Sequence, residues 1–119
     1  MSLVNLKTKV SDSKKKPTRY YSNLQEKRVA KELNGRQTKN SGATPWQKGD
    51  VLANDWLLEC KTKTTKVDTF SIKKEWIEKN KKEALFMGKE NSAIVFNFGP
   101  NEENYYIIDE FTFKSLINK

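Results

Sequence analysis

Residues 48–61 read KGDVLANDWLLECK, two short apolar runs joined by Asn54-Asp55. Apolar runs separated by an Asn/Asp pair predict two strands and a tight turn, with strands over 50–53 and 56–62. Side chains alternate along a strand, so Trp56, Leu58 and Cys60 share one face of the second strand. Glu59 and Lys61 share the other face with Leu57. The pattern therefore sets a carboxylate and an ammonium group side by side on one strand.

A helix is expected before this hairpin, from Ser22 to about Asn34. Ser22 and Gln25 match a capping box, and Gly35 supplies a C-terminal stop. One face of this helix carries Glu26, Val29, Ala30 and Leu33, of which three are apolar and should meet the core. Glu26 then lies at the edge of a buried face. It either points inward as a metal ligand or points to water beside Lys27.

The remaining chain predicts further strands and helices. A short strand is expected over 36–40, a long helix from an N-cap at Ser71 to Gly88, strands over 92–98 and 105–108, and a last helix ending near Asn118. Asp109 or Thr112 caps this last helix. The long helix carries a core-facing stripe, which is Ile72, Trp76, Ile77, Asn80, Ala84 and Met87. The order αβββαββα predicts an α/β fold with a central mixed β-sheet flanked by helices, in which a helical crossover links the third and fourth strands.

Composition limits the classes of function. The 119 residues suit one domain over 20–119, preceded by a flexible basic arm over 1–19 that either follows a DNA backbone or is a solvated tail. The net charge of +8 favours a polyanionic partner. One Cys and no His exclude an internal disulfide, a Cys/His zinc site and Ser-His-Asp catalysis within the chain. Without a long apolar run or a signal peptide, we expect an intracellular, cytoplasmic protein with no membrane span.

Asp50, Glu59 and Lys61 form a candidate catalytic site. Oxygen ligands from Asp50 and Glu59 suit Mg²⁺, with the backbone carbonyl of Cys60 as an extra ligand and Glu26 as a ligand of a second metal site. The metal would activate a water and polarise a phosphodiester, while Lys61 would orient the water or stabilise transition-state charge. The alternative is a surface salt bridge between Glu59 and Lys61.

These residues resemble the PD-(D/E)XK nuclease superfamily, and more narrowly the archaeal and phage-type Holliday junction resolvases. The matching segments are EKRVAKEL at 26–33, NSGA at 40–43, KGDV at 48–51 and LECK at 58–61, although Gly49 stands where the superfamily has proline. The resemblance implies a restriction-endonuclease-like core, Glu26, Asp50 and Glu59 as metal-binding acids, and Lys61 as the catalytic lysine. It also implies Mg²⁺, with Mn²⁺ as a substitute, and places Ser41 near the scissile phosphate.

The same resemblance implies a homodimer that cuts two opposed strands of a four-way DNA junction during DNA recombination. Trp46 and Phe70 are candidates for a dimer interface or a DNA wedge, or are ordinary packing residues. Three other functions fit the residues. They are a nuclease on duplex, nicked or mismatched DNA, a non-catalytic basic DNA-binding module, and an RNA-binding protein. The last of these would not explain why two acids and a lysine are arranged together.

Overall fold

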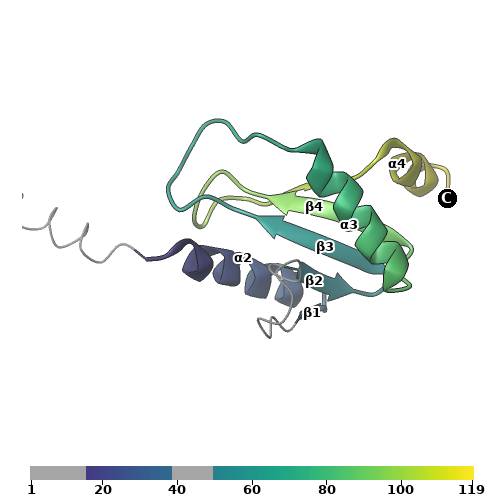
Figure 1. The fold of residues 1–119 in the computed structure, drawn as a ribbon, viewed down its shortest axis with the longest axis horizontal. Helices are drawn as coiled ribbons and strands as arrows, with labels where there is room; N and C mark the ends of the chain where they lie inside the picture. The colour runs from purple at the N-terminus through teal and green to yellow at the C-terminus, as the bar shows by residue number, and fades with distance from the viewer. Residues whose placement is uncertain (1–15, 39–49) are drawn as a thin grey trace, which may run out of the picture.

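The computed structural model describes residues 16–38 and 50–119, and in these residues three helices flank a five-stranded mixed β-sheet (Figure 1). The predicted α/β class with a mixed sheet is confirmed. The elements are α2 (Thr18–Glu32), β1 (Arg36–Gln37), β2 (Asp50–Ala53), β3 (Trp56–Lys61), α3 (Lys74–Phe86), β4 (Asn91–Phe96), β5 (Tyr105–Ile107) and α4 (Glu110–Ile117).

The sheet has the order β1-β2-β3-β4-β5. The predicted hairpin is present, because β2 and β3 pair antiparallel and Asn54 adopts a left-handed φ of 52° in the turn between them. Strand β3 pairs with β4 in parallel, whereas β1–β2 and β4–β5 are antiparallel. A parallel pair needs a crossover connection, and α3 provides it as predicted.

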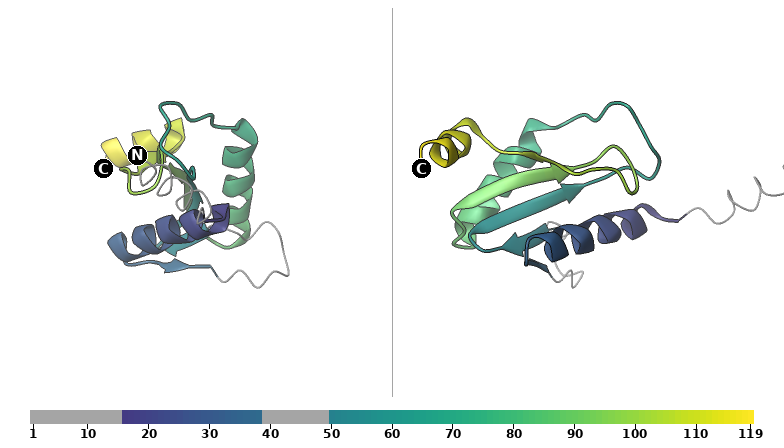
Figure 2. Two further views of the ribbon diagram at one scale, coloured as in Figure 1. Left: turned by 90° about the vertical axis from the view of Figure 1, so that its left-hand side faces the viewer. Right: turned by 180° about the vertical axis from the view of Figure 1, so that it is seen from behind.

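Helices α2 and α3 cover opposite faces of the sheet (Figure 2). One core cluster packs Val29 and Ala30 of α2 against the sheet residues Val51, Ala53, Leu58, Cys60, Ala93 and Val95. A second cluster packs Ala84 of α3 against Leu52 and Leu57. The side chains of β3 therefore alternate between the two faces of the sheet, as the sequence predicts. Leu58 and Cys60 face α2, and Leu57 faces α3.

Helix α2 begins four residues before the predicted start. Pro17 is its N-cap, which suits a residue whose fixed φ and missing N–H are tolerated at a helix start. The Ser22 hydroxyl donates to the Arg19 carbonyl at 3.1 Å within the helix, so the predicted capping box with Gln25 is wrong.

The end of α2 also differs from the prediction. Asn34, with a φ of 54°, takes the left-handed conformation that was expected of Gly35. Gly35 is needed for another reason, because a Cβ at this position would lie 2.4 Å from the Leu52 carbonyl oxygen. The glycine thus allows the chain leaving α2 to pass closely over β2.

Helix α3 begins at Lys74 after an N-cap at Lys73 without a side-chain hydrogen bond, so Ser71 is not its cap. Asn80 and Ala84 of the predicted stripe are buried, whereas Met87 lies beyond the helix end and is 42% exposed. The Asp109 cap of α4 is confirmed, since its carboxylate accepts the Thr112 N–H at 2.8 Å.

The remaining predictions differ in their bounds or lie outside the described residues. Strand β1 ends at Gln37, and β3, β4 and β5 are each shorter than predicted. Phe70 packs against Phe96 and Phe98, with ring centroids 5.0 and 6.4 Å away, which agrees with its role as a packing residue. Trp46 and most of the predicted arm lie outside the described residues. In the described part of the chain, no helix is long and apolar enough to cross a membrane.

Candidate active site

Asp50 and Glu59 lie directly opposite each other in the antiparallel pair of β2 and β3. Directly opposed residues share one face of a sheet, with Cβ atoms about 5 Å apart. Lys61 follows two residues later on the same face, and its Nζ lies 3.0 Å from Glu59 Oε2. The strand register thus gathers two carboxylates and one ammonium group on the face that α3 covers.

Asp50 is placed where its charged form is unfavourable. Its side chain is buried, with a residue exposure of 4%. Burial raises the pKa of the Asp50 carboxyl from 3.8 to about 8, and the negative charges of Glu59, Glu83 and Glu26 add to this shift. A divalent cation beside Asp50 would offset both causes, since it stabilises the ionised carboxylate.

Lys61 is held from two sides. Glu59 pairs with its ammonium group, and the ring of Trp76 on α3 lies 4.3 Å from the Lys61 Nζ. Such an ammonium over an indole face is a favourable cation–π contact. The ion pair between Glu59 and Lys61 that the sequence offered as an alternative is therefore present, and it is partly buried against α3, with side-chain exposures of 14% and 29%.

Asn80 fixes α3 against the sheet one turn after Trp76. Its buried amide donates to the carbonyls of Leu57 on β3 and Ala93 on β4 at 3.3 and 3.1 Å. These two bonds tie the helix to both strands of the parallel pair. Trp76 lies one turn earlier on the helix that these bonds attach to the sheet.

Glu83 is a partly buried acid near this cluster that the sequence reasoning missed. Burial raises the pKa of its carboxyl, and the charge of Glu59 adds to the shift. Glu83 follows Asn80 by three residues and Trp76 by seven, so all three lie on one face of α3. This spacing could have revealed Glu83 from the sequence, because it places an acid beside the uncharged core-facing stripe of α3.

Glu26 lies on the other side of the sheet. It is buried on α2, with 7% exposure, and accepts a hydrogen bond from Gln37 Nε2 at 3.0 Å. The alternative in which Glu26 points to water is therefore wrong. Gln37 pairs with Val51, which faces α2, whereas Asp50 shares the face of α3 with Leu52. Glu26 thus approaches Asp50 from the opposite face, although its charge still raises the Asp50 pKa.

Two other predicted site residues have no established role here. Ser41 lies outside the described residues. The Cys60 side chain belongs to the core beneath α2, and burial raises the pKa of its thiol well above the usual value. The thiol is therefore a packing group, and the metal-binding role of the Cys60 carbonyl stays a prediction.

No protein-family model, curated protein or solved structure matches this chain.

The residues fit a hard cation such as Mg²⁺. Across residues 16–38 and 50–119, no three acidic or thiol groups converge closely enough to hold a metal ion by themselves. Mg²⁺ keeps several waters and is usually bound by only one or two carboxylates together with substrate phosphates. Asp50 and Glu59, facing each other across β2 and β3, supply such a pair.

Proposed function

We propose that the protein is a Mg²⁺-dependent DNA endonuclease with a restriction-endonuclease-like, PD-(D/E)XK core. Its proposed substrate is branched DNA, most specifically a Holliday junction. The observation that carries the proposal is the pairing of Asp50 with Glu59 across two strands, with Lys61 on the same face. Two carboxylates and a lysine are the groups needed to hold a hard cation beside a phosphodiester and to stabilise negative charge there.

Each residue of the site has a distinct role in this proposal. Asp50 and Glu59 would hold Mg²⁺, which supplies Lewis-acid polarisation of the scissile phosphate when bound. Lys61 would orient the attacking water or stabilise the charge that develops on the phosphate. Trp76 would keep the Lys61 ammonium in place. Glu26, on the opposite face, would assist only as a ligand of a second metal ion.

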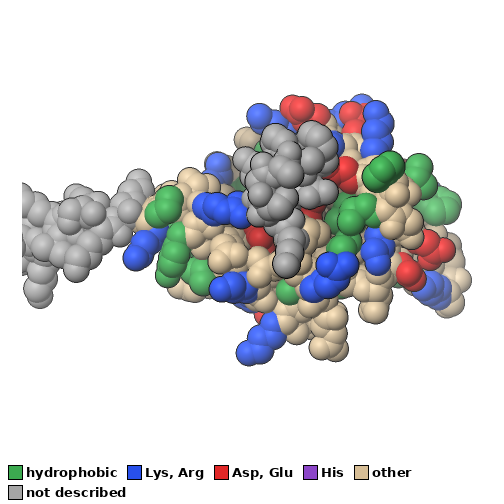
Figure 3. All heavy atoms as spheres, turned by 60° about the horizontal axis from the view of Figure 1, so that its bottom comes forward, with side chains coloured by type: hydrophobic (Ala, Val, Ile, Leu, Met, Phe, Trp, Pro, Cys, Tyr) green, Lys and Arg blue, Asp and Glu red, His purple; other side chains and the backbone are tan. Residues whose placement is uncertain are grey.

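The charge of the molecule supports a nucleic acid as the substrate. The net charge is +8, and Lys63 and Lys66 follow Lys61 in the exposed segment after β3. Figure 3 shows Lys and Arg side chains spread over the visible described surface, with acidic side chains among them. Phosphate contacts from such lysines would position DNA with little dependence on its sequence.

We also propose that the protein acts as a homodimer, since a junction with two-fold symmetry is cut by two opposed sites. Large exposed side chains on α4, including Phe111 at 79% and Ile117 at 63%, support an interface with a second copy. Sedimentation velocity should give twice the chain mass of 13.8 kDa. A purely monomeric profile across micromolar concentrations would contradict the dimer but leave the nuclease proposal intact.

The decisive experiment compares Asp50→Asn and Glu59→Gln with the wild type on a labelled four-way junction. We expect both variants to lose Mg²⁺-dependent cleavage and to bind the junction normally in Ca²⁺. Asp55→Asn is the matched control, because Asp55 is exposed in the turn after β2 and should cut as the wild type does. Wild-type activity in both site variants would disprove the metal-site assignment, and a wild type that cuts no DNA would favour a binding module.

A substrate panel tests the more specific part of the proposal. Four-way junctions, flaps, nicked duplexes and linear duplexes of equal length are compared at equal concentration. Preferential cleavage of the four-way junction, with paired symmetric cuts, supports a resolvase. Equal cleavage of linear duplex would retain the nuclease and replace the junction as its substrate.

A further inference from the structure

A pocket of about 340 Å³ lies beside the first half of α2 and is separate from the acidic cluster. Its lining combines two tyrosines, two cations and buried amides. The lining includes Lys16, Tyr20, Tyr21, Gln25, Arg28 and Asn97. In Figure 3, hydrophobic and basic side chains gather where α2 begins, beside the atoms drawn in grey. The volume falls in the range of small-ligand sites, which are roughly 300–1,000 Å³.

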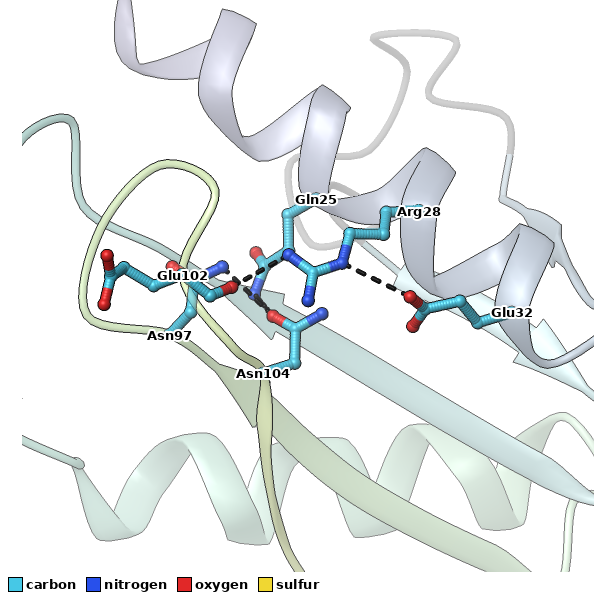
Figure 4. Close-up of polar contacts among 6 residues, drawn as sticks. All are labelled: Gln25, Arg28, Glu32, Asn97, Glu102 and Asn104. Atoms are coloured by element: carbon cyan, nitrogen blue, oxygen red, sulfur yellow. Dashed lines mark hydrogen bonds and ion pairs between the residues drawn. The ribbon is translucent and has the colours of Figure 1, made fainter.

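Buried amide groups form one wall of the pocket (Figure 4). Gln25 Nε2 donates to the Lys61 carbonyl at 2.8 Å and to Asn104 Oδ1 at 3.2 Å, and Asn97 Nδ2 donates to the same Asn104 oxygen at 3.0 Å. Gln25 and Asn97 are 4% and 3% exposed. Their side chains are therefore held in fixed positions by each other and by the backbone.

The same network leaves two polar atoms unused. Gln25 Oε1 and Asn104 Nδ2 are buried and have no hydrogen-bond partner among the described residues. Buried polar atoms in native proteins are nearly always paired, with protein, water or a ligand. Gln25 lines the pocket, so its unpaired acceptor suits a ligand whose edge carries a hydrogen-bond donor.

Aromatic and cationic groups form the rest of the lining. The rings of Tyr20 and Tyr21 meet edge to face with centroids 5.2 Å apart, and Lys16 Nζ lies 5.3 Å from the Tyr20 ring centre. The Arg28 guanidinium is anchored by donating to the Glu102 carbonyl at 2.8 Å and lies 3.4 Å from Glu32. The pocket thus offers flat faces for stacking and cations for an anionic group.

The pocket adjoins the candidate active site through the backbone. Gln25 precedes Glu26 on α2, and Thr62, which also lines the pocket, follows Lys61 at the end of β3. The hydrogen bond from Gln25 to the Lys61 carbonyl joins the two places directly. The acidic cluster faces α3 and the pocket lies beside α2, so a DNA strand would contact both by passing around the end of β3, where Lys61 and Thr62 lie.

We propose that this pocket binds one unpaired nucleotide of the DNA strand next to the scissile phosphate. The base stacks on the tyrosines, the unpaired Gln25 Oε1 accepts a hydrogen bond from its edge, and Lys16 and Arg28 contact the phosphate. Stacking on aromatic rings tolerates every base, whereas amide groups add hydrogen bonds to base edges. The identity of this ligand rests on the proposed nuclease function, since only a nucleic-acid substrate brings a base to this place. Flaps provide such unpaired nucleotides directly, a fully paired four-way junction provides one when a base pair at its branch point opens, and intact duplex provides none.

The test uses branched oligonucleotides that carry one unpaired 2-aminopurine beside the branch, and matched oligonucleotides with an abasic site at that position. Binding of the full chain is measured by fluorescence and by a filter assay in Ca²⁺. Tyr20→Ala and Tyr21→Ala should each weaken binding of the 2-aminopurine oligonucleotide about tenfold and change its fluorescence response. They should leave binding of the abasic oligonucleotide unchanged. Tyr106→Ala is the matched control, because Tyr106 and Tyr20 are both 43% exposed and Tyr106 does not line the pocket.

The outcomes separate this proposal from the nuclease proposal. If the tyrosine variants bind both oligonucleotides like the wild type, the nucleotide pocket is disproved, whatever the cleavage assay shows. If they weaken both equally, the pocket contacts phosphate alone and the proposed base site is wrong. If the base-dependent loss occurs in a protein that cuts no DNA, the pocket stands and the nuclease proposal falls.

Discussion

The environment of Asp50 disfavours the charged form of its carboxyl group when no cation is bound. Its pKa is raised to about 8 by burial first and then by neighbouring carboxylates. Between pH 4 and pH 8 the unfolded chain releases this proton more readily than the folded one. The folded state therefore loses stability as pH rises through this window.

Asp50→Asn should accordingly stabilise the metal-free protein at pH 8, by up to about 5 kcal/mol, and flatten the fall in stability between pH 4 and pH 8. Thermal melting over this pH range measures the effect. Adding Mg²⁺ should raise the melting temperature of the wild type at pH 8 and leave the variant unchanged. Asp55→Asn, an exposed acid in the adjacent turn, should retain the wild-type pH profile. A variant less stable than the wild type at pH 8 would contradict this account of Asp50.

Trp76 positions Lys61 without touching the substrate in this scheme. The cation–π contact at 4.3 Å is lost in Trp76→Leu and partly kept in Trp76→Phe. We expect a drop in kcat for junction cleavage of about fivefold in the leucine variant and less in the phenylalanine variant, with KM unchanged. Equal losses in both variants, or a change confined to KM, would show that the ring acts only in packing.

At the scale of elements, α3 decides the geometry of the site because it carries the groups that cover the β2–β3 face. Asn80 is its main polar attachment, with two hydrogen bonds to adjacent strands. Asn80→Ala should lower the free energy of unfolding by about 2 kcal/mol, since it opens a cavity and leaves two strand carbonyls short of a donor. Urea denaturation measures this loss. Lys79→Ala, exposed on the same helix, should cost less than about 0.5 kcal/mol.

Some helices and strands could be predicted from the sequence, and others could not. The β2–β3 hairpin followed from the Asn54-Asp55 turn and from strict alternation, both of which are local signals. The Asp109 cap of α4 was also a local signal, but the starts of α2 and α3 could not be predicted, because other interactions override the favourable caps Ser22 and Ser71. Pro17 begins α2 earlier, and Phe70 packs against Phe96 and Phe98 just before the later start of α3. Tertiary packing of this kind has no counterpart in a short window of sequence.

In the candidate site, too, some positions follow from local sequence and others depend on tertiary packing. The neighbours Glu59 and Lys61 could be placed on one face from spacing alone, and their ion pair follows from it. Trp76 and Glu83 could not, because their approach depends on how the crossover helix lies on the sheet. Glu26 was expected to join Asp50 in one cluster, yet helical periodicity gives burial and not the side of the sheet on which a helix packs.

At the scale of the whole molecule, the basic segment after β3 and helix α4 lie toward opposite ends (Figure 1). The net charge of +8 is therefore only partly available to one DNA duplex. Lys63 and Lys66 lie in the segment that continues directly from Lys61, and Lys66 Nζ lies 3.7 Å from Glu102 Oε2. Lys114 lies on α4 and pairs with Glu110. We expect DNA to be bound along the first of these regions.

Salt titration tests this expectation. If about four phosphates are neutralised, the Kd for a junction in Ca²⁺ should rise about a hundredfold between 50 and 200 mM salt, because condensed counterions are released on binding. Lys63→Gln should reduce the slope of log Kd against log salt by about one, and Lys114→Gln should leave it unchanged. Binding that is insensitive to salt would contradict phosphate contacts altogether. If both substitutions reduce the slope equally, DNA also contacts the α4 end of the molecule. That result would contradict binding confined to the segment after β3.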